Sequence, residues 1–370
     1  MNLVTLTVAW FVGLFLMWRV RTVPKQEPAG ADHGPPRVSV VIPARNEAHN
    51  LPRLLASLSQ QSLAPHEVLV VDDDSSDDTA AVARSLGATV IGSGGPADGW
   101  MGKGWACWLG AQAATGDLLL FLDADAWLEP EAVADLARLQ QHRGGLVTVQ
   151  PYHVTVRAYE QLSAFFNIVL MAGLNAFTPL GERVQPGGGF GPCVMCRRQD
   201  YFRVGGHAAS RCAMLEDLAL AQAFAEHGLP VGSFGGRGTV SFRMYPDGLR
   251  SLLEGWTKNF GQGAACLSPV MLLLSVAWVC GCFGAAFDPL LRHAWLDAGL
   301  LVAYGLIYSA YAAQVWWMLR RIGRFRVATA VLFPVPLLAF GLVMAVSLFL
   351  KVVVGRAVWK GRVVPIGGRG

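Results

Sequence analysis

The sequence predicts an α/β domain joined to apolar helices that lie in a membrane. Between residues 37 and 247, short apolar runs alternate with helix-like stretches, which is typical of a parallel sheet covered on both faces. Only 15% of the 370 residues are charged, and no acidic residue follows Asp297. This composition excludes a disordered chain, a coiled coil and an ordinary fully soluble enzyme.

The first half of the α/β domain has well-marked elements. Apolar runs predict strands over Arg37–Ile42, Glu67–Val71, Ala88–Ile91 and Asp117–Leu122. Apolar residues at helical spacing predict helices over Asn50–Gln60, Asp78–Leu86 and Gly104–Ala114. Ligands bind beyond the carboxyl ends of the strands in such sheets, so polar clusters at those ends are candidate site residues.

Four uncharged segments are candidates for the membrane: Met1–Trp18, Leu267–Phe287, Ala298–Leu319 and Val327–Leu350. About 20 helical residues cross a hydrocarbon core of roughly 30 Å. The first segment is followed by Arg19 and Arg21 rather than by a small-residue cleavage site, so we interpret it as a retained anchor. The two arginines place the following domain in the cytoplasm of a multi-pass protein of the cell membrane.

The last apolar segment leaves two arrangements open. Basic residues precede it between Arg320 and Arg326 and recur in the tail, and both groups favour the cytoplasmic side. Pro334 and Pro336 disrupt a continuous helix. The segment therefore either crosses the membrane or forms a kinked or re-entrant hairpin, which gives three or four spans. We interpret the net charge of +4 as attraction to lipid headgroups rather than to nucleic acid.

Acidic residues follow two of the predicted strands. Residues 72–79 read DDDSSDDT, and a helix N-cap at Ser76 or Asp77 explains only part of this run, because three consecutive carboxylates need a ligand or hydrogen-bond donors. Asp123 and Asp125 follow the fourth strand. Two carboxylates at this spacing can bind a hard divalent cation, which in turn holds a diphosphate.

Four motifs in this order resemble the family 2 glycosyltransferases of the GT-A fold: VVIPARNE at 40–47, VVDDDS at 70–75, DAD at 123–125 and the pair Glu216-Asp217. The resemblance covers roughly residues 37 to 260. GWMGKGWA at 99–106 and WKGR at 359–362 are most similar to the membrane-bound branch that acts on carotenoid, hopanoid and related lipids.

The resemblance implies an inverting transfer of a hexose from a nucleotide-diphosphate sugar to a membrane lipid. A UDP-sugar is the first candidate for the donor, and Mg²⁺ or Mn²⁺ would be the cofactor. Asp217 would be the general base. The metal would be bound by Asp123 and Asp125, with Asp125 preferred over Asp123 as the direct ligand. The donor would be held by Pro43, Ala44, Arg45, Glu47, Asp73, Lys103 and Asp123. The acceptor would lie near Gly189, Phe190, Gly191, Glu216 and Trp256.

Simpler interpretations stay open for several of these residues. Glu216 and Asp217 would also begin the helix that follows, Lys103 would also be a solvated lysine, and glycines 187–189 and 191 would also form a flexible surface loop. Leu252–Trp256 keeps only the tryptophan of an Arg-Trp pair found in polymerising synthases, which argues against a processive polysaccharide synthase. The intact acidic motifs argue against an inactive membrane scaffold.

These inferences divide the chain into an anchor at 1–21, the glycosyltransferase domain at 37–247, an amphipathic interfacial helix at 248–264, membrane segments at 265–350 and a basic tail at 351–370. The interfacial helix is predicted from an apolar stripe formed by Leu249, Leu252, Leu253, Trp256 and Phe260. Tyr159–Phe177 is either a second interfacial element or a core helix. The Cys193-x-x-Cys196 motif predicts buried reduced thiols rather than a zinc site.

Overall fold

The computed structural model describes residues 1–25, 36–184, 186–209, 216–263, 268–350, 356–359 and 362–365. Contacts divide the chain into two compact units that interleave in sequence. The sheet unit contains Arg21–Tyr152 and Gln185–Arg243. The helical unit contains Met1–Val20, His153–Val184 and Met244–Gly370. The predicted boundaries are continuous along the chain, whereas residues 153–184 within the predicted 37–247 domain pack with the helical unit.

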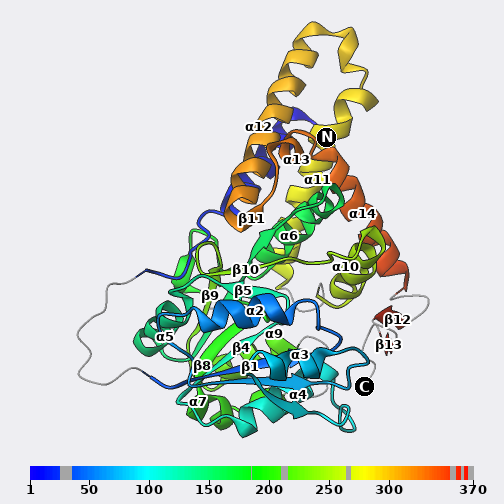
Figure 1. Cartoon of the computed structure of the whole chain (residues 1–370). Coiled ribbons are helices and arrows are strands. Elements are labelled where there is room, and N and C mark those ends of the chain that lie inside the picture. The colour runs from blue at the N-terminus through cyan, green and yellow to red at the C-terminus, as the bar shows by residue number, and fades with distance from the viewer. Residues whose placement is uncertain are drawn as a thin grey trace. The chain divides into compact units, whose positions relative to one another are not determined.

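A seven-stranded sheet forms the sheet unit, in the order β3-β2-β1-β4-β8-β6-β9 (Figure 1). Its strands are β1 (Val38–Ala44), β2 (Glu67–Asp72), β3 (Thr89–Gly92), β4 (Leu118–Leu122), β6 (Leu146–Gln150), β8 (Cys193–Arg197) and β9 (Val231–Gly235). The first four neighbours are parallel, with Val41 paired to Leu69 of β2 and Phe121 of β4. A short antiparallel pair, β5 (Ala126–Leu128) and β10 (Val240–Phe242), completes the strands of this unit.

The prediction of a parallel sheet is wrong for β8, which runs antiparallel to both β4 and β6. The physical reason is its connection. A parallel neighbour needs a crossover connection, usually a helix that packs on a face of the sheet, whereas β8 follows a long excursion of the chain through the helical unit. The sheet is therefore mixed, although the parallel strand ends that carry the predicted acidic motifs are present.

Helices cover both faces of this sheet. Val41, Val71 and Phe121 share a buried core with α4 (Gly102–Ala113), α7 (Arg198–Arg203) and α9 (Glu216–Glu226). Gly110 allows α4 to approach closely, because a Cβ there would lie 3.1 Å from a methyl group of Val71. The alternate strand residues point to the opposite face. Figure 1 shows α2 (Leu51–Ser59) and α5 (Ala132–Arg143) on that side, and α3 (Thr79–Ser85) and α8 (Gly206–Ala209) complete the helices described for this unit.

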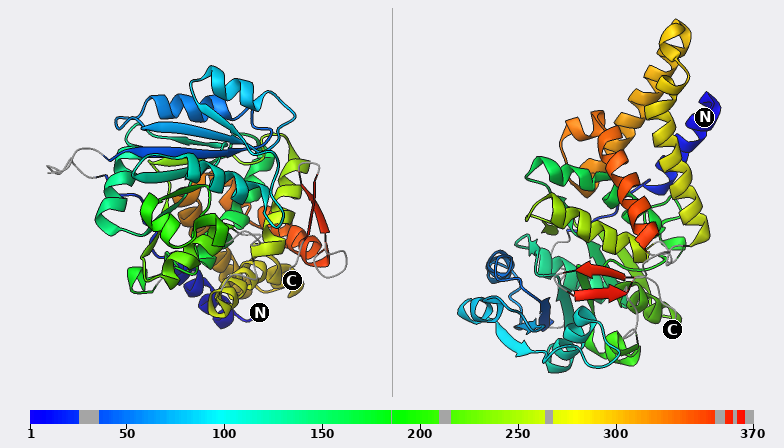
Figure 2. Two further views of the ribbon diagram at one scale, coloured as in Figure 1. Left: turned by 90° about the horizontal axis from the view of Figure 1, so that it is seen from below. Right: turned by 90° about the vertical axis from the view of Figure 1, so that its right-hand side faces the viewer.

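The helical unit contains α1 (Leu3–Leu16), α6 (Ala164–Gly173), α10 (Leu249–Gly263), α11 (Pro269–Leu291), α12 (Ala298–Ile322), α13 (Val327–Val331) and α14 (Pro334–Phe349). Short 3₁₀ helices lie at Ala158–Ser163, Gly181–Arg183 and Ala294–Leu296. His153 and Val154 of β7 (Tyr152–Val154) pair with β11 (Gly323–Arg324). Near the C-terminus, β12 (Arg356–Trp359) and β13 (Arg362–Pro365) form an antiparallel pair (Figure 2).

Two helices in the described part of the chain are long and apolar enough to cross a membrane: α11, with 23 residues, and α12, with 25. Helix α1 is shorter than the predicted anchor, since its 14 residues extend only about 21 Å at 1.5 Å per residue. The predicted final segment is divided into α13 and α14, and α14 begins at Pro334. This division confirms the predicted interruption at the two prolines.

Two further helices test the predicted interfacial elements. Nine of the ten residues of α6 are buried, and Phe166 stacks on Trp256 of α10 at 4.7 Å. The structure therefore favours the core-helix interpretation for this segment. In α10, Leu252 and Trp256 are 1% exposed, whereas Leu249 is 47% exposed. The helix is present as predicted, part of its apolar stripe packs within the unit, and its interfacial position stays a prediction. The Phe260 side chain lies outside the described part of the structure.

Candidate active site

One lysine lies among three carboxylates beside the carboxyl end of β4. Lys103 Nζ is 2.9 Å from Asp123 Oδ1, 3.3 Å from Asp217 Oδ2 and 3.9 Å from Glu216 Oε1. The Lys103 side chain is 31% exposed, so solvent reaches the cluster. The structure thus brings together residues that the sequence assigns to the donor, the acceptor and catalysis.

Negative charges outnumber positive charges in this cluster. Burial alone would lower the pKa of Lys103, but Asp123, Asp217 and Glu216 together raise this pKa well above its ordinary value of 10.5. Lys103 is therefore an ion-paired ammonium rather than a solvated lysine. One ammonium among three carboxylates leaves an excess of negative charge, and such an environment attracts a cation.

Helix starts position these side chains. Lys103 is the second residue of α4, and Glu216 and Asp217 are the first two residues of α9. Acidic residues are favourable in the first turn of a helix, where unpaired N–H groups carry partial positive charge. Glu216 and Asp217 therefore fit the helix-start interpretation and also contact Lys103, so their position is compatible with both predicted roles.

The predicted acceptor segment packs directly against the cluster. A Cβ at Gly191 would overlap the carboxylate of Asp217, so the backbone of residue 191 lies against that side chain. A Cβ at Gly189 would lie 2.7 Å from Thr148 Cγ2, and Phe190 is only 3% exposed. Residues 189–191 therefore form a packed wall beside Asp217 rather than a flexible surface loop.

The loops after β1, β2 and β3 meet at Asp73, which is 5% exposed. Arg45 Nη1 donates a hydrogen bond to the backbone oxygen of Asp73 at 2.8 Å and lies 3.6 Å from Asp73 Oδ2. Ser93 Oγ donates to Asp73 Oδ1 at 3.2 Å. Trp105 Nε1 donates to the Ser93 backbone oxygen at 3.2 Å. Ser93 is not among the residues predicted from the sequence, although its position directly after a parallel strand is a signal for it.

The remaining donor residues lie at the end of β1. Pro43 and Ala44 are its last residues, and the Glu47 N–H donates to Thr79 Oγ1 at 2.8 Å. Asn46, with φ 53°, and Asp74, with φ 57°, adopt the left-handed conformation. Non-glycine residues rarely adopt this conformation, and such backbone is concentrated at functional sites.

The acidic residues that follow β2 make different kinds of contact. Asp77 Oδ1 accepts a hydrogen bond from the Thr79 N–H at 3.0 Å, and Asp77 Oδ2 accepts from the Ala48 N–H at 3.2 Å. Although burial alone would raise the pKa of Asp77, these and neighbouring hydrogen bonds lower it below its ordinary value. The N-cap of α3 is Asp78 and not the predicted Ser76 or Asp77. Asp77 instead accepts hydrogen bonds from the start of α3 and from the loop after β1, whereas Asp73 contacts Arg45 and Ser93.

A divalent cation fits the donor chemistry of Asp123 and Asp125 only with help from a ligand. Asp125 lies in the turn between β4 and β5, two residues after Asp123. In the described ranges no cluster of three or more His, Cys, Asp or Glu side chains is arranged to hold a metal. Carboxylates suit Mg²⁺ or Mn²⁺, but most of the coordination sphere would have to come from diphosphate oxygens and water.

Trp256, the remaining predicted acceptor residue, belongs to the helical unit. Its side chain is 1% exposed, stacks on Phe166 and donates from Nε1 to Ser163 Oγ at 3.0 Å. In this structure Trp256 therefore packs the interior of its own unit, and its acceptor role stays a prediction. Cys193 and Cys196 are buried free thiols on β8, as predicted, and burial raises the pKa of both.

The chain is similar to carotenoid glycosyltransferases of Staphylococcus. It is 43% identical to the 4,4'-diaponeurosporenoate glycosyltransferase of Staphylococcus haemolyticus over 251 residues, which is 66% of each chain. It is 36% identical to the enzyme of the same name from Staphylococcus aureus over 331 residues, covering 88% of this chain and 87% of the relative.

The fold is shared with a solved glycosyltransferase. The mannosyltransferase PcManGT from Pyrobaculum calidifontis, in complex with GDP-Man and Mn²⁺, matches 95% of this chain and 96% of its own, with a TM-score of 0.52 and 18% identity. This likeness shows the α/β GT-A-like fold with its mixed sheet. Residues 39–204 match the family model described as Glycosyl transferase family 2. Together with the staphylococcal relatives, this match shows that the chain belongs to glycosyltransferase family 2.

Proposed function

We propose that this enzyme transfers a hexose from a nucleotide-diphosphate sugar to the carboxylate of a carotenoid acid held in the cell membrane. A UDP-sugar is the first candidate for the donor. The main structural support for this proposal is the cluster of Lys103 with Asp123, Glu216 and Asp217, which lies beside the packed wall formed by residues 189–191. The acceptor class is suggested by the staphylococcal relatives, whose names specify 4,4'-diaponeurosporenoate.

The donor would lie along the carboxyl ends of the parallel strands. Arg45 and Asp73, which contact one another after β1 and β2, would hold its base and ribose. Asp123 and Asp125 would hold Mg²⁺ or Mn²⁺, which when bound would offset the charge of the departing diphosphate. Lys103 already contacts Asp123 and would place a second positive charge near the same phosphates.

The acceptor chemistry affects the role of Asp217. A carboxylic acid has an ordinary pKa near 4, so its oxygen reaches the anomeric carbon as an ionised nucleophile with no proton to remove. A hydroxyl acceptor, in contrast, needs a base to take its proton. We propose that Asp217 acts as this base toward hydroxyl acceptors, and that toward a carboxylate it acts by positioning Lys103, which lies 3.3 Å away.

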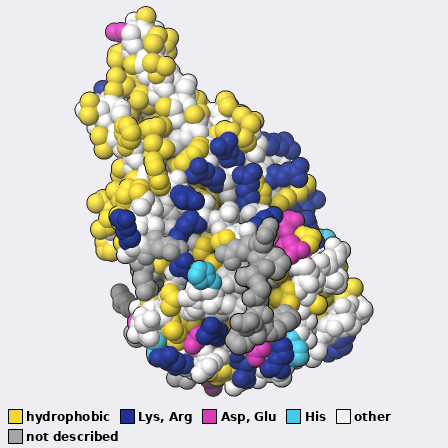
Figure 3. Space-filling view, turned by 90° about the vertical axis from the view of Figure 1, so that its left-hand side faces the viewer, with side chains coloured by type: hydrophobic (Ala, Val, Ile, Leu, Met, Phe, Trp, Pro, Cys, Tyr) yellow, Lys and Arg dark blue, Asp and Glu magenta, His cyan; other side chains and the backbone are white. Residues whose placement is uncertain are grey.

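The helical unit would hold the enzyme at the membrane. Helices α11 and α12 have the length and composition of spans, and α11 exposes Val270, Leu273 and Leu290 on its surface. Figure 3 shows apolar side chains over much of the upper part of one face, and lysine and arginine side chains gathered across its middle. By the excess of arginine after α12, the sheet unit would lie in the cytoplasm.

Supplying the full chain with radiolabelled UDP- and GDP-sugars, Mn²⁺ and a total lipid extract tests this function. We expect label in a single lipid-soluble product. Label in an insoluble polymer would instead support a processive synthase, and absence of transfer from every donor would support a scaffold without activity.

A further inference from the structure

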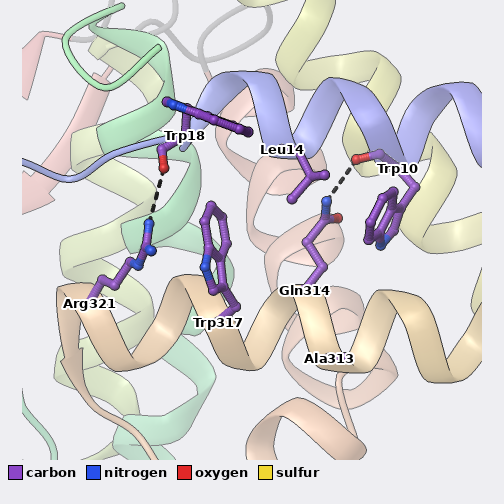
Figure 4. A pocket seen from close by; sticks show the side chains of 7 residues that line it. All are labelled: Trp10, Leu14, Trp18, Ala313, Gln314, Trp317 and Arg321. Carbon is purple, nitrogen blue, oxygen red and sulfur yellow. Dashed lines mark hydrogen bonds between the residues drawn. The ribbon is translucent and has the colours of Figure 1, made fainter. Parts of the chain in front are cut away.

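A groove in the helical unit lies between α1 and the C-terminal half of α12 (Figure 4). It has a volume of about 480 Å³ and is open on one side. Its walls include Leu14 and the three indoles of Trp10, Trp18 and Trp317, and Arg321 stands at one end. The groove is therefore apolar and aromatic along its length and cationic at one end.

Arg321 has a fixed position, and most of its N–H donors are available to a ligand. Its guanidinium lies over the Trp317 ring, 3.9 Å from the centroid, and Nη1 donates to the Trp18 backbone oxygen at 3.2 Å. A guanidinium has five N–H donors. Within the described part of the chain no carboxylate pairs with Arg321. It therefore presents an uncompensated positive charge with a fixed orientation.

The amide of the groove is hydrogen-bonded through both its oxygen and its nitrogen. Gln314, 3% exposed, accepts a hydrogen bond from Trp278 Nε1 at 2.9 Å and donates from Nε2 to the Trp10 backbone oxygen at 2.7 Å. This amide joins α1, α11 and α12 and does not need a ligand. An occupant would consequently be an amphiphile with one anionic head at Arg321 and an apolar body along the indoles.

The local charge identifies the class of head group. Arg320, Arg321, Arg324 and Arg326 lie within seven residues, and no acidic residue follows Asp297 anywhere in the sequence. Basic pockets between helices at the cytoplasmic side of a membrane bind anionic head groups, and tryptophan is favoured at that level. We propose that the groove binds an anionic phospholipid, with the phosphate on Arg321 and an acyl chain against Trp317 and Leu14.

This proposal rests on the proposed membrane position of the helical unit and not on the transfer reaction, so the two can fail separately. Full-length protein in mild detergent is titrated with phosphatidylglycerol or phosphatidylcholine of identical acyl chains, and bound lipid is counted by native mass spectrometry. Arg321→Gln is compared with Arg320→Gln, which removes the same charge from an exposed neighbour outside the groove. Trp317→Leu is a second variant that leaves all arginines in place.

We expect phosphatidylglycerol to bind in preference to phosphatidylcholine. Arg321→Gln should weaken its binding at least about tenfold, the size of one charge-assisted hydrogen bond. Trp317→Leu should weaken binding of both lipids, and Arg320→Gln should change it less than twofold. Equal binding of the two lipids, or equal loss in the two arginine variants, would overturn the proposal.

Two competition arms distinguish other anions. Inorganic phosphate that displaces phosphatidylglycerol completely would show a free phosphate site rather than a lipid site. Retinoic acid, a long polyene carboxylic acid, is the second competitor. If it binds more tightly than phosphatidylglycerol, and if Arg321→Gln loses this binding, the groove is a site for the acceptor. Either result would overturn the assignment to a phospholipid, whereas failure of both competitors would support it.

Discussion

Lys103 Nζ lies 2.9 Å from Asp123 Oδ1, so an ammonium contacts the carboxylate that the family motif assigns to the metal. The same ammonium contacts Asp217, the predicted base. The donor side and the acceptor side of the site are thus joined through one side chain. Cation binding at Asp123 and the position of Asp217 should consequently depend on Lys103.

Lys103→Met should strengthen binding of Mn²⁺ in the absence of nucleotide, because the cation no longer competes with the ammonium for Asp123. The loss of one nearby positive charge is worth about 1 kcal/mol, or about fivefold in affinity. Electron paramagnetic resonance titration of free Mn²⁺ measures this change. Lys25→Met, which removes an exposed lysine of the same unit, is the control. Unchanged or weaker Mn²⁺ binding in Lys103→Met would contradict competition.

Asp125→Asn should abolish the metal-dependent part of nucleotide diphosphate affinity, since one amide oxygen does not replace the carboxylate in holding a hard cation. Calorimetric titration of UDP and GDP with and without Mn²⁺ measures this part. Asp247→Asn, at an exposed position of the helical unit, should leave it unchanged. If Asp125→Asn kept full metal-dependent affinity, Asp125 would not be a metal ligand.

Asp217→Asn should reduce transfer to a hydroxyl acceptor by about 10²–10⁴-fold, the usual cost of losing a general base, equivalent to roughly 2.7–5.4 kcal/mol of barrier. Transfer to a carboxylate acceptor should fall much less, because no proton is removed. Nucleotide-sugar affinity should stay near its original value. Initial rates with a carotenoid alcohol and the matching acid measure the difference, and near-normal turnover with the alcohol would point to Glu216 as the base.

Gly191→Ala should strongly reduce transfer to a hydroxyl acceptor, for which Asp217 is the proposed base, because the added methyl group overlaps the Asp217 carboxylate and forces it to move. Gly104→Ala is a matched control from the same cluster, since its Cβ would lie 3.8 Å from Glu216 Cβ, an ordinary contact. We expect Gly104→Ala to keep most activity and both variants to bind nucleotide. Equal activity of the two variants would show that the position of Asp217 is unimportant for transfer.

Stability of the sheet unit should fall as the pH falls below about 6.5. Burial, and secondarily the charge of Lys103, lowers the pKa of His207 to about 3, and its neutral ring lies 2.8 Å from the Tyr201 hydroxyl. Below the ordinary pKa of histidine, His207 binds a proton in the unfolded chain but not in the folded chain. The free energy of unfolding therefore falls by up to about 1.4 kcal/mol per pH unit, until the pH reaches the pKa of His207 in the folded chain.

Thermal unfolding of the full chain between pH 5 and 8 measures this effect. His207→Gln should be less stable at neutral pH but show a shallower decline on acidification. His142→Gln, at an exposed position, should show the original slope. An unchanged slope in His207→Gln would contradict a neutral buried ring as its source.

The sequence predicted the elements that follow local patterns. Apolar runs located β1 to β4 within a few residues, and Pro334 marked the break between α13 and α14. The direction of β8 was not predictable, because it depends on a chain excursion of more than 30 residues and not on the strand's own sequence. Burial of α6 was also undecided, since an apolar helix looks the same in a protein core and in an interface.

The site was predicted by motif and completed by geometry. Asp123, Glu216 and Asp217 were identifiable as acidic residues after a strand and before a helix. Their shared contact with Lys103 was not, because Asp217 lies 114 positions from Lys103 and the two side chains meet only through the fold. The contact of Gly191 with Asp217 was likewise invisible in sequence, where a glycine-rich segment fits a loose loop equally well.

The most direct test of the proposed reaction is the chemical stability of the product formed from a labelled nucleotide sugar and a defined carotenoid acid. Transfer to a carboxylate forms a sugar ester, which mild alkali cleaves, whereas transfer to a hydroxyl forms an alkali-stable glycoside. We predict an organic-soluble labelled product that releases its sugar in mild alkali and that does not form when the acid is replaced by its methyl ester. An alkali-stable product, or equal transfer to the methyl ester, would contradict transfer to a carotenoid carboxylate.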